Sequence, residues 1–474
     1  MFMRFLRIAP VFFLLLLCSV PGAAQTQLPD TPAAHQFSAW LETFNRGDLD
    51  AYRDFLQKNY PSAMDRLGNY MGFREMTGGF EFKKLEESTP TRLTALVQER
   101  GSDQMARVTL AVEAADPHHI TSLDLRAIPR PAEFALPHLS QSDLIAAAKK
   151  NLEHEVATDH FSGAVLVEKD GKPIFSEADG LADREHKIPN SLKTRFRIGS
   201  MNKMFTAVAT LQLVQAGKLG LDDPIGKYLP DYPNKDVASK VQIHHLLTHT
   251  GGTGDIFGPD FDSHRLELRT LDDYLKLYGK RDLKFEPGSK WEYSNYGFIL
   301  LGAIIEKVSG QSYYDYVREH IYAPAGMTST GSEPEDQAVP DRSIGYTKMD
   351  SPQWKPNTDT LPYRGTSAGG GYSTVDDLAR FAAALEQHKL LDAHYTELLT
   401  TGKPGTPDDS YAFGFDDHKV NGIRCFGHGG GAPGMNGQLE ICPSDGYVVA
   451  VLANLDPPAA SRVSDFITNR LPEK

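Results

Sequence analysis

The segment from Arg197 to Phe205 constrains this chain more than any other, because it places a serine and a lysine three residues apart before a long apolar run. If the run is helical, positions i and i+3 share a face, so the amine of Lys203 reaches the hydroxyl of Ser200. A serine becomes a nucleophile when a neighbouring group can take its proton, and the N–H groups of a helix start favour negative charge there. The segment therefore predicts a nucleophile beside its base. The alternative is a capping serine with a solvated lysine.

Residues 1–24 have the three-part pattern of a secretory signal peptide. Two arginines precede an apolar core from Val11 to Val20, and small residues stand before the expected cleavage site. The core is shorter than the roughly 20 residues that span a bilayer, which argues against a permanent membrane anchor. We therefore expect cleavage near Ala24-Gln25 and a periplasmic or secreted protein.

Length and charge narrow the functional classes. A chain of 474 residues is long enough for two or three domains. Its formal net charge of -13 becomes more negative once the signal peptide is removed, and such a balance repels nucleic acid and anionic membranes. We therefore expect a small-molecule or peptide substrate as the partner, while the sequence leaves the oligomeric state open.

Two cysteines, Cys425 and Cys442, remain after signal cleavage. They lie symmetrically about Pro433-Gly434, where a hairpin could turn, so they could face each other across adjacent strands. An oxidising compartment would allow a disulfide there. Two buried thiols are the alternative, because sequence does not define the geometry that a disulfide needs.

Residues 25–128 predict a small α+β domain. Apolar residues recur at helical spacing from Phe37 to Leu56, and Gly47-Asp48 divides this run into two helices. Short strand-like runs separated by turn residues follow between Phe80 and Leu125, and they predict a curved antiparallel sheet on which the helices pack. This order resembles the ketosteroid-isomerase-like fold. The resemblance implies that a small-ligand pocket is one option, as in many members of that fold. Because these residues show no cluster of acidic, basic and polar side chains, a structural or substrate-screening module is the favoured interpretation.

Residues 129–138 carry three prolines and predict an extended linker. The second domain then covers residues 139–474. It begins with a helix and with a hairpin signal at Asp170-Gly171. The apolar helix that starts near Ser200 ends near Gly217, so the serine lies at the mouth of whatever pocket forms there.

A second polar cluster, Tyr293 and Asn295, precedes an apolar helix expected from Phe298 to Val308. A phenol whose pKa is lowered by a nearby ammonium can act as a general base, and an amide can hold a substrate carbonyl. Another Tyr-x-Asn, from Tyr232 to Asn234, lies in proline-rich sequence typical of a surface turn.

A third cluster lies near the C-terminus between expected strands, and it consists of His428, Gly429, Gly430 and Gly431. Consecutive glycines allow a substrate to approach the backbone closely. A literal G-x-G-x-x-G begins at Gly429. No strand-to-helix turn surrounds it, so the pattern does not indicate dinucleotide binding.

Two other patterns are set aside. Gly365 to Gly369 matches the G-x-S-x-G elbow, but polar, proline-containing sequence precedes it and two glycines follow, so Ser367 is not the expected nucleophile. His245 and His249 could share a helical face, but the glutamate of the H-E-x-x-H zinc motif is missing, so a structural turn after a helix is the better interpretation. We therefore expect no metal and no cofactor.

Together the clusters resemble the three ordered motifs of the serine β-lactamase and penicillin-recognising family: Ser200-Met201-Asn202-Lys203, Tyr293-Ser294-Asn295 and His428-Gly429-Gly430. The Tyr-x-Asn motif is similar to that of the class C and D-aminopeptidase/esterase branch. Leu246 to Thr250 and Glu286 to Gly288 support the resemblance, which covers about Leu139 to Leu471. It implies an α+β fold, in which an antiparallel sheet built from both ends of the domain is flanked by helices, with an all-helical subdomain between them.

The resemblance also implies a role for each residue. Ser200 would attack a carbonyl and form an acyl-enzyme, and Lys203 and Tyr293 would share the role of base. Asn295 would bind the substrate's carbonyl. The backbone N–H groups of Ser200 and Gly431 would form the oxyanion hole, and water would then release the acyl group.

The third motif departs from the family pattern, since many members carry Lys-Thr-Gly there and its lysine attracts a substrate carboxylate. His428 and Gly429 stand in its place, and a histidine of ordinary pKa is mostly neutral at pH 7. The departure favours an esterase, amidase or D-amino-acid peptidase. A class C-like β-lactamase or D,D-carboxypeptidase is the second hypothesis, and a non-catalytic cell-wall or ligand-binding protein on the same scaffold is the third.

Overall fold

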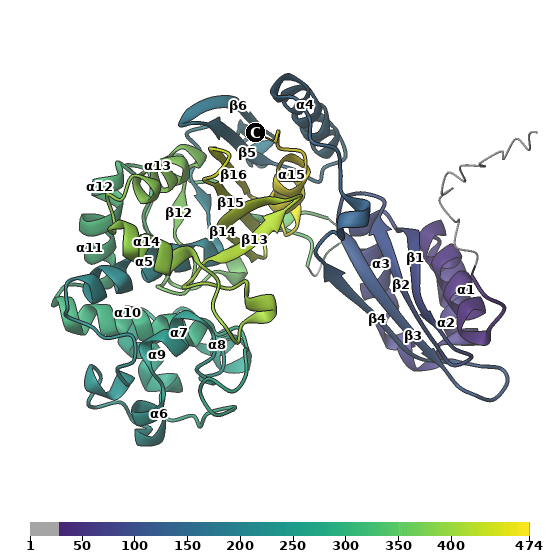
Figure 1. The fold of residues 1–474 in the computed structure, drawn as a ribbon, viewed down its shortest axis with the longest axis horizontal. Coiled ribbons are helices and arrows are strands. Elements are labelled where there is room, and N and C mark those ends of the chain that lie inside the picture. The colour runs from purple at the N-terminus through teal and green to yellow at the C-terminus, as the bar shows by residue number, and fades with distance from the viewer. Residues whose placement is uncertain (1–27, 350, 352, 474) are drawn as a thin grey trace, which may run out of the picture. The chain divides into compact units, whose positions relative to one another are not determined.

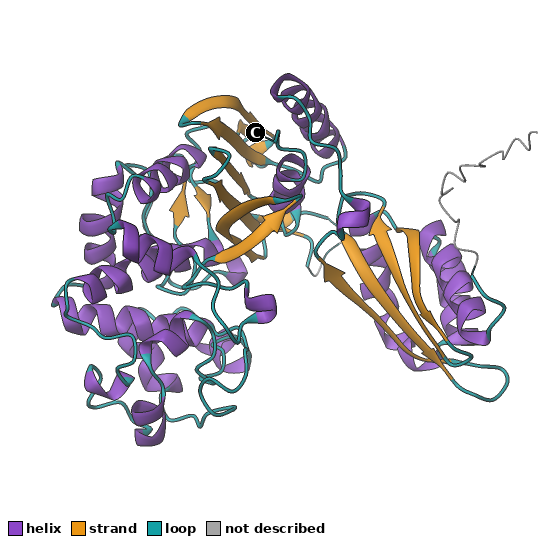
Figure 2. Ribbon diagram, in the orientation of Figure 1, coloured by secondary structure: helices purple, strands orange, loops and turns teal. Residues whose placement is uncertain are grey.

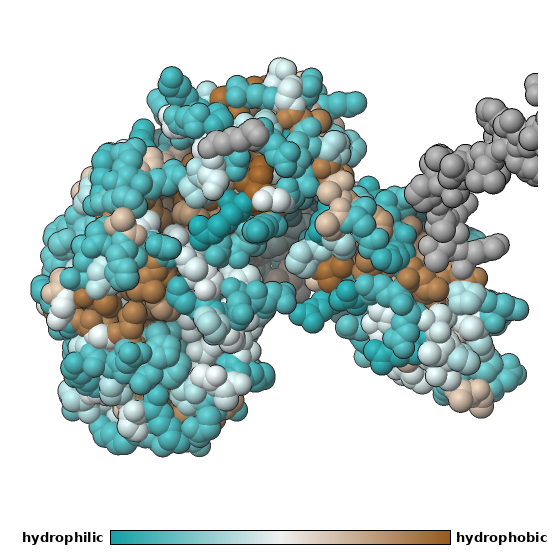
Figure 3. Space-filling view, viewed as in Figure 1, coloured by the Kyte–Doolittle hydropathy of each residue, from teal (hydrophilic) through white to brown (hydrophobic). Residues whose placement is uncertain are grey.

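The computed structural model describes residues 28–349, 351 and 353–473, and it divides into two compact units at Pro129 and Arg130 (Figure 1). The expected signal peptide and its cleavage site lie outside the described residues. Within the described part of the chain, no helix is long and apolar enough to cross a membrane. On the face drawn in Figure 3, hydrophilic residues cover most of the surface.

The first unit packs helices against a four-stranded antiparallel sheet (Figure 2). The helices are α1 (Pro32–Arg46), α2 (Leu49–Asn59) and α3 (Leu67–Thr77). The strands follow one another in chain order as β1 (Phe80–Ser88), β2 (Arg92–Glu99), β3 (Met105–Val112) and β4 (Ile120–Ile128).

The break between the first two helices has a local cause. Gly47 ends α1 in the left-handed region, with φ 70°, and the Asp48 side chain caps α2 by accepting from the N–H of Ala51. The third helix, α3, was not expected, because it buries only Thr77 fully and so shows little helical periodicity of apolar residues. The resemblance of this unit to the ketosteroid-isomerase-like fold stays a prediction.

The second unit is built on a six-stranded sheet of order β13-β14-β15-β16-β5-β6, antiparallel throughout. Its strands are β5 (Gly163–Lys169), β6 (Lys172–Asp179), β13 (Asp416–Val420), β14 (Ile423–Ala432), β15 (Met435–Cys442) and β16 (Tyr447–Ala453). The early strand β5 pairs with the late strand β16, so the sheet joins both ends of the unit. This arrangement confirms the predicted α+β fold class.

Side chains that alternate along β5 and β16 build two separate cores, one on each face of the sheet. Val165 and Val451 face α4 (Gln141–Ala157) and α15 (Ala459–Thr468), whereas Leu166 and Leu452 face the helical part of the unit. Two central helices of that part are α5 (Asn202–Gln215) and α10 (Asn295–Ser309). Both are nearly all buried, which places their first turns inside the molecule.

Smaller elements complete the second unit. The helices are α6 (Lys235–Lys240), α7 (Ile243–Leu247), α8 (Pro259–His264), α9 (Leu271–Tyr278), α11 (Tyr313–Val317), α12 (Ala323–Ala325), α13 (Val375–Glu386) and α14 (Ala393–Thr400). The short paired strands are β7 (Leu181–Asp183) with β8 (Ile188–Pro189), β9 (Phe196–Arg197) with β12 (Tyr372–Ser373), and β10 (Tyr346–Thr347) with β11 (Lys355–Pro356).

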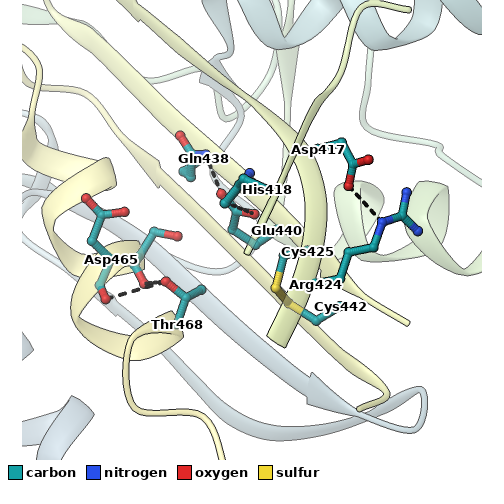
Figure 4. The surroundings of a disulfide bond; sticks show 10 residues. Asp417, His418, Arg424, Cys425, Gln438, Glu440, Cys442, Asp465 and Thr468 are labelled. Atoms are coloured by element: carbon teal, nitrogen blue, oxygen red, sulfur yellow. Dashed lines mark hydrogen bonds and ion pairs between the residues drawn. A yellow bond between two sulfur atoms is a disulfide. The ribbon is translucent and has the colours of Figure 1, made fainter. Parts of the chain in front are cut away.

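The two cysteines form a disulfide between β14 and β15 (Figure 4). Pro433-Gly434 makes the turn between these strands, as the sequence predicts, and Gly434 has φ 70°. The strand register therefore places Cys425 opposite Cys442, with their Cα atoms 4.2 Å apart. The alternative of two free thiols is thereby excluded.

Candidate active site

Ser200 lies in a single 3₁₀ turn, Gly199–Met201, that leads directly into α5. The α-helix itself begins at Asn202, two residues after the serine. Gly199 has φ 52°, and a Cβ at this position would lie 3.0 Å from the backbone nitrogen of Gly431. Glycine therefore lets the chain turn sharply before Ser200 while the third motif packs against it.

Lys203 is fully buried, and its Nζ lies 3.2 Å from Ser200 Oγ. It lies 2.7 Å from Asn295 Oδ1 and also donates to the backbone carbonyl of Ala368. Burial lowers the pKa of Lys203 to about 7, although the charge of Asp255 acts in the opposite direction. A neutral amine has two hydrogens, which the two carbonyl oxygens accept, and one lone pair, which can accept the proton of Ser200.

Tyr293 contacts both members of this pair. Its hydroxyl is hydrogen-bonded to Ser200, and the Nζ of Lys203 lies 4.7 Å from the centroid of its ring. Burial nevertheless raises the pKa of Tyr293 above its ordinary value. The expectation that an ammonium lowers the pKa of this phenol is therefore wrong, because burial dominates and Lys203 lies over the ring.

Asn295 is the first residue of α10, which begins three residues earlier than the sequence indicates. Ser294 caps the helix by accepting a hydrogen bond from the N–H of Gly297 at 3.0 Å. The helix start thus holds Asn295 against Lys203. The first and second motifs meet through the start of two buried helices, α5 and α10.

A buried chain of hydrogen bonds joins the second and third motifs through His249, Tyr411 and His428. The backbone N–H of Ser294 donates to His249 Nδ1 at 3.1 Å, so His249 carries its proton on Nε2. That nitrogen lies 3.0 Å from the hydroxyl of Tyr411, which lies 3.2 Å from His428 Nε2. His428 Nδ1 then donates to the carbonyl of Gly429. One proton assignment therefore satisfies every member.

The imidazoles of His249 and His428 are both neutral at pH 7. Burial and nearby Lys203 lower the pKa of His428 to about 4, and burial also holds the pKa of His249 well below its ordinary value. The ring of His249 lies 4.3 Å from the ring of Tyr293, centroid to centroid. The hydrogen-bonded residues that pack against Tyr293 are thus neutral and add no charge beside it. Sequence reasoning assigned His249 to a structural turn and did not identify Tyr411.

A cavity of about 150 Å³ opens beside Ser200. Asn295 and Gly431 line it together with the serine, and apolar groups form much of the remaining wall: Ile256, Phe257, Phe261, Leu361, Pro362 and Met435. His428, Gly429 and Gly430 lie outside this wall. Gly430 packs so closely on the segment before Ser200 that a Cβ there would lie 1.9 Å from the carbonyl oxygen of Ile198. Substrate binding by His428, Gly429 and Gly430 stays a prediction.

The patterns that were set aside lie elsewhere. Ser367 is fully buried and does not line the cavity. His245 accepts a hydrogen bond from the backbone N–H of Gln242 and lies apart from the network of His249. Over the described residues, no group of three or more His, Cys, Asp or Glu side chains could hold a metal ion.

The sheet flanked by helices and the serine beside a buried lysine define a serine hydrolase. The family model described as β-lactamase matches residues 148–472, and the chain belongs to this family. The match does not extend into the first unit.

Two relatives are each similar in sequence to part of this chain. PbpX of Bacillus subtilis (strain 168) is 32% identical over 299 residues, which are 62% of this chain and 71% of the relative. Esterase EstB of Burkholderia gladioli is 39% identical over 195 residues, which are 38% of this chain and 50% of the relative.

Two solved structures share the fold. A penicillin-binding protein from Bacillus halodurans has a TM-score of 0.60 and 36% identity, covering 66% of this chain and 96% of that one. A D-stereospecific amidohydrolase from Streptomyces sp. has a TM-score of 0.59 and 29% identity, covering 69% of this chain and 98% of that one.

Proposed function

We propose that the chain is an exported serine hydrolase that forms an acyl-enzyme at Ser200 and acts on esters or amides, including D-amino-acid amides and peptides, whose acyl group presents an apolar side chain and no carboxylate. The observation that carries this proposal is the position of Lys203, a buried amine 3.2 Å from Ser200 Oγ with a pKa lowered to about 7. Similarity to an esterase and to a D-stereospecific amidohydrolase supports the class of substrate.

In the acylation step, the lone pair of Lys203 takes the proton of Ser200 while Oγ bonds to the substrate's carbonyl carbon. The N–H groups of Ser200 and Gly431 stabilise the resulting oxyanion, a contribution of roughly 3 to 4 kcal/mol per donor in other enzymes. The proton then passes from Lys203 through the hydroxyl of Tyr293 to the leaving oxygen or nitrogen, and the bond to the carbonyl carbon breaks.

The deacylation step uses the same groups in reverse. A water molecule takes the place of the leaving group, and Lys203 accepts its proton through Tyr293 while the water oxygen bonds to the acyl carbon. Ser200 Oγ leaves and recovers a proton from Lys203. Because burial raises the pKa of Tyr293, this phenol acts as a proton carrier and Lys203 is the base.

The cavity supports an acyl group without a carboxylate. Its wall, as far as the described residues form it, contains no lysine, arginine or histidine, and His428, which does not line it, is neutral at pH 7. A substrate carboxylate would therefore lose its hydration without gaining a cation. Penicillins and D-alanyl termini carry such a carboxylate, so they should be poorer substrates than apolar esters and amides.

Export is supported by two independent features. Residues 1–24 have the pattern of a signal peptide, and the disulfide between Cys425 and Cys442 is of a kind that persists in oxidising compartments.

The test is intact-protein mass and turnover with a short-chain activated ester and, separately, with a penicillin. The wild type should turn over the ester, Ser200→Ala should lose at least about 1000-fold in kcat, and Ser367→Ala should keep its activity as the matched control. Melting temperatures check that each variant folds. A lasting penicillin adduct would favour the penicillin-recognising alternative, and no Ser200-dependent reaction with either compound would favour the binding-protein alternative.

A further inference from the structure

The carboxylate of Asp255 binds Asn295 at two points. Its Oδ1 accepts from the backbone N–H of Asn295 at 3.0 Å, and its Oδ2 accepts from the side-chain Nδ2 at 3.2 Å. Oδ1 also accepts from the N–H of Ile256 at 2.7 Å, which holds the carboxylate in place. Asp255 lies on the loop between α7 and α8, 40 residues before Asn295. None of the three sequence motifs includes it.

This contact determines which way the amide of Asn295 points. An ionised carboxylate only accepts hydrogen bonds, so it selects Nδ2, and the amide oxygen must then point to Lys203, 2.7 Å away. The flipped amide would place its oxygen against the carboxylate and its hydrogens against the hydrogens of Lys203. In the observed orientation Nδ2 uses one hydrogen for Asp255, and the second is left for a substrate carbonyl.

The same carboxylate acts on Lys203 electrostatically. The titratable groups that face Lys203 are Tyr293, His249, His428 and Asp255. The first three are neutral at pH 7, because burial raises the pKa of the phenol and lowers the pKa of each imidazole. Asp255 therefore supplies the negative charge that favours the protonated form of Lys203.

We propose that Asp255 is a positioning residue of this active site. It fixes the amide of Asn295 so that its oxygen holds Lys203 and one N–H is presented to the substrate, and its charge sets the balance between the two forms of the lysine. The proposal rests on the proposed function at Ser200. A purely structural role is the alternative, since Asp255 also accepts from the first N–H of α10 and so acts as a helix cap.

The test compares Asp255→Asn with Asp392→Asn. Asp392 caps α14 by accepting from the N–H of Tyr395 at 2.9 Å, so it controls for the loss of a capping carboxylate away from the site. In Asp255→Asn the new amide offers both an N–H donor and a carbonyl acceptor, so it can pair with either orientation of the Asn295 amide, and that orientation is no longer fixed. We expect kcat/KM for the ester to fall between about 10- and 100-fold, the effect of a small misplacement of a catalytic group. Asp392→Asn should keep the wild-type value.

The pH–rate profile separates the two roles. Loss of the negative charge disfavours protonated Lys203, so the acidic limb of the profile should move to lower pH in Asp255→Asn. A helix cap would lower the melting temperature and leave the limb in place. Asp255→Glu, which keeps the charge, should leave the limb close to its wild-type position.

A measurement without turnover makes the result independent of the proposed function. Titration of the Lys203 side chain by carbon-13 NMR in a Ser200→Ala background should give a lower pKa with Asp255→Asn than without it. An unchanged lysine titration, together with catalytic losses equal to those of Asp392→Asn, would overturn the proposal. If the wild type is inactive but the lysine titration still shifts, the result contradicts the proposed function at Ser200 and supports the role of Asp255.

Discussion

Lys203 is the residue on which the proposed chemistry of this site depends. Its side chain is fully buried, and no carboxylate among the described residues forms an ion pair with it. Burial therefore lowers the pKa of Lys203 to about 7. An amine in water would be protonated at neutral pH and could not accept the proton of Ser200. The same burial carries a cost, since folding must desolvate the amine or remove its proton.

That cost predicts a pH-dependent stability difference between the wild type and Lys203→Met. The pKa of Lys203 is lower in the folded than in the unfolded chain, so the unfolded state binds more protons between pH 7 and pH 10, and the free energy of unfolding rises with pH across this window. Relative to Lys203→Met, the wild type should gain roughly 3 to 4 kcal/mol from pH 7 to pH 10. Denaturant unfolding of both proteins checks this. A difference that does not change with pH would show that Lys203 keeps an ordinary pKa.

Three elements bring the motifs together: α5 carries Lys203, α10 begins at Asn295, and β14 contributes Gly430 and Gly431. Strand β14 can approach the turn at Ser200 only because its residues there lack side chains. The disulfide to β15 and the Pro433-Gly434 turn hold this strand in register. The close packing at Gly430 therefore links the strand to the geometry of the proposed oxyanion hole.

Gly430→Ala should disrupt that packing. Its Cβ would lie 1.9 Å from the carbonyl oxygen of Ile198, so β14 or the segment before Ser200 must shift. We expect a loss of about 1 to 3 kcal/mol in the free energy of unfolding and roughly a 100-fold lower kcat for the ester.

Gly72→Ala is the matched control for this prediction. Gly72 lies inside α3, and a Cβ there meets no atom within 4 Å, so alanine should be neutral or stabilising. Wild-type kinetics in Gly430→Ala would show that the spacing between β14 and Ser200 has little influence on the reaction.

At the scale of the molecule, each unit has a hydrophobic core of its own. The first unit buries Phe37, Trp40 and Phe44 against its sheet, and the second builds two cores on the two faces of the six-stranded sheet. The described side chains of the candidate site all belong to the second unit. Domains with a separate core commonly fold alone.

A chain that begins at Arg130 should therefore fold and keep the ester kcat/KM of the full protein when it is produced in an oxidising compartment. Circular dichroism and ester kinetics check this. An insoluble or inactive truncated chain would show that the first unit contributes to folding or to the reaction, and a change confined to large substrates would support a substrate-screening role.

Residue spacing alone predicts the parts of the fold and the site that depend on local geometry. Helical spacing predicts the approach of Lys203 to Ser200, a hairpin turn at Pro433-Gly434 allows the two cysteines to face each other, and three ordered motifs predict the family and its α+β fold. The helix α3 escaped prediction, because a helix that buries few residues leaves little apolar periodicity.

The groups that surround these residues come from distant parts of the chain, and long-range packing sets their positions. Asp255 lies 40 residues from Asn295, and His249 lies 162 residues from Tyr411, so no local pattern joins them. The direction in which the pKa of Tyr293 shifts and the low pKa of Lys203 also depend on burial, which results from packing among helices and strands distant in the chain. Short-range geometry is encoded in residue spacing, whereas desolvation depends on everything that the folded chain brings around a charge.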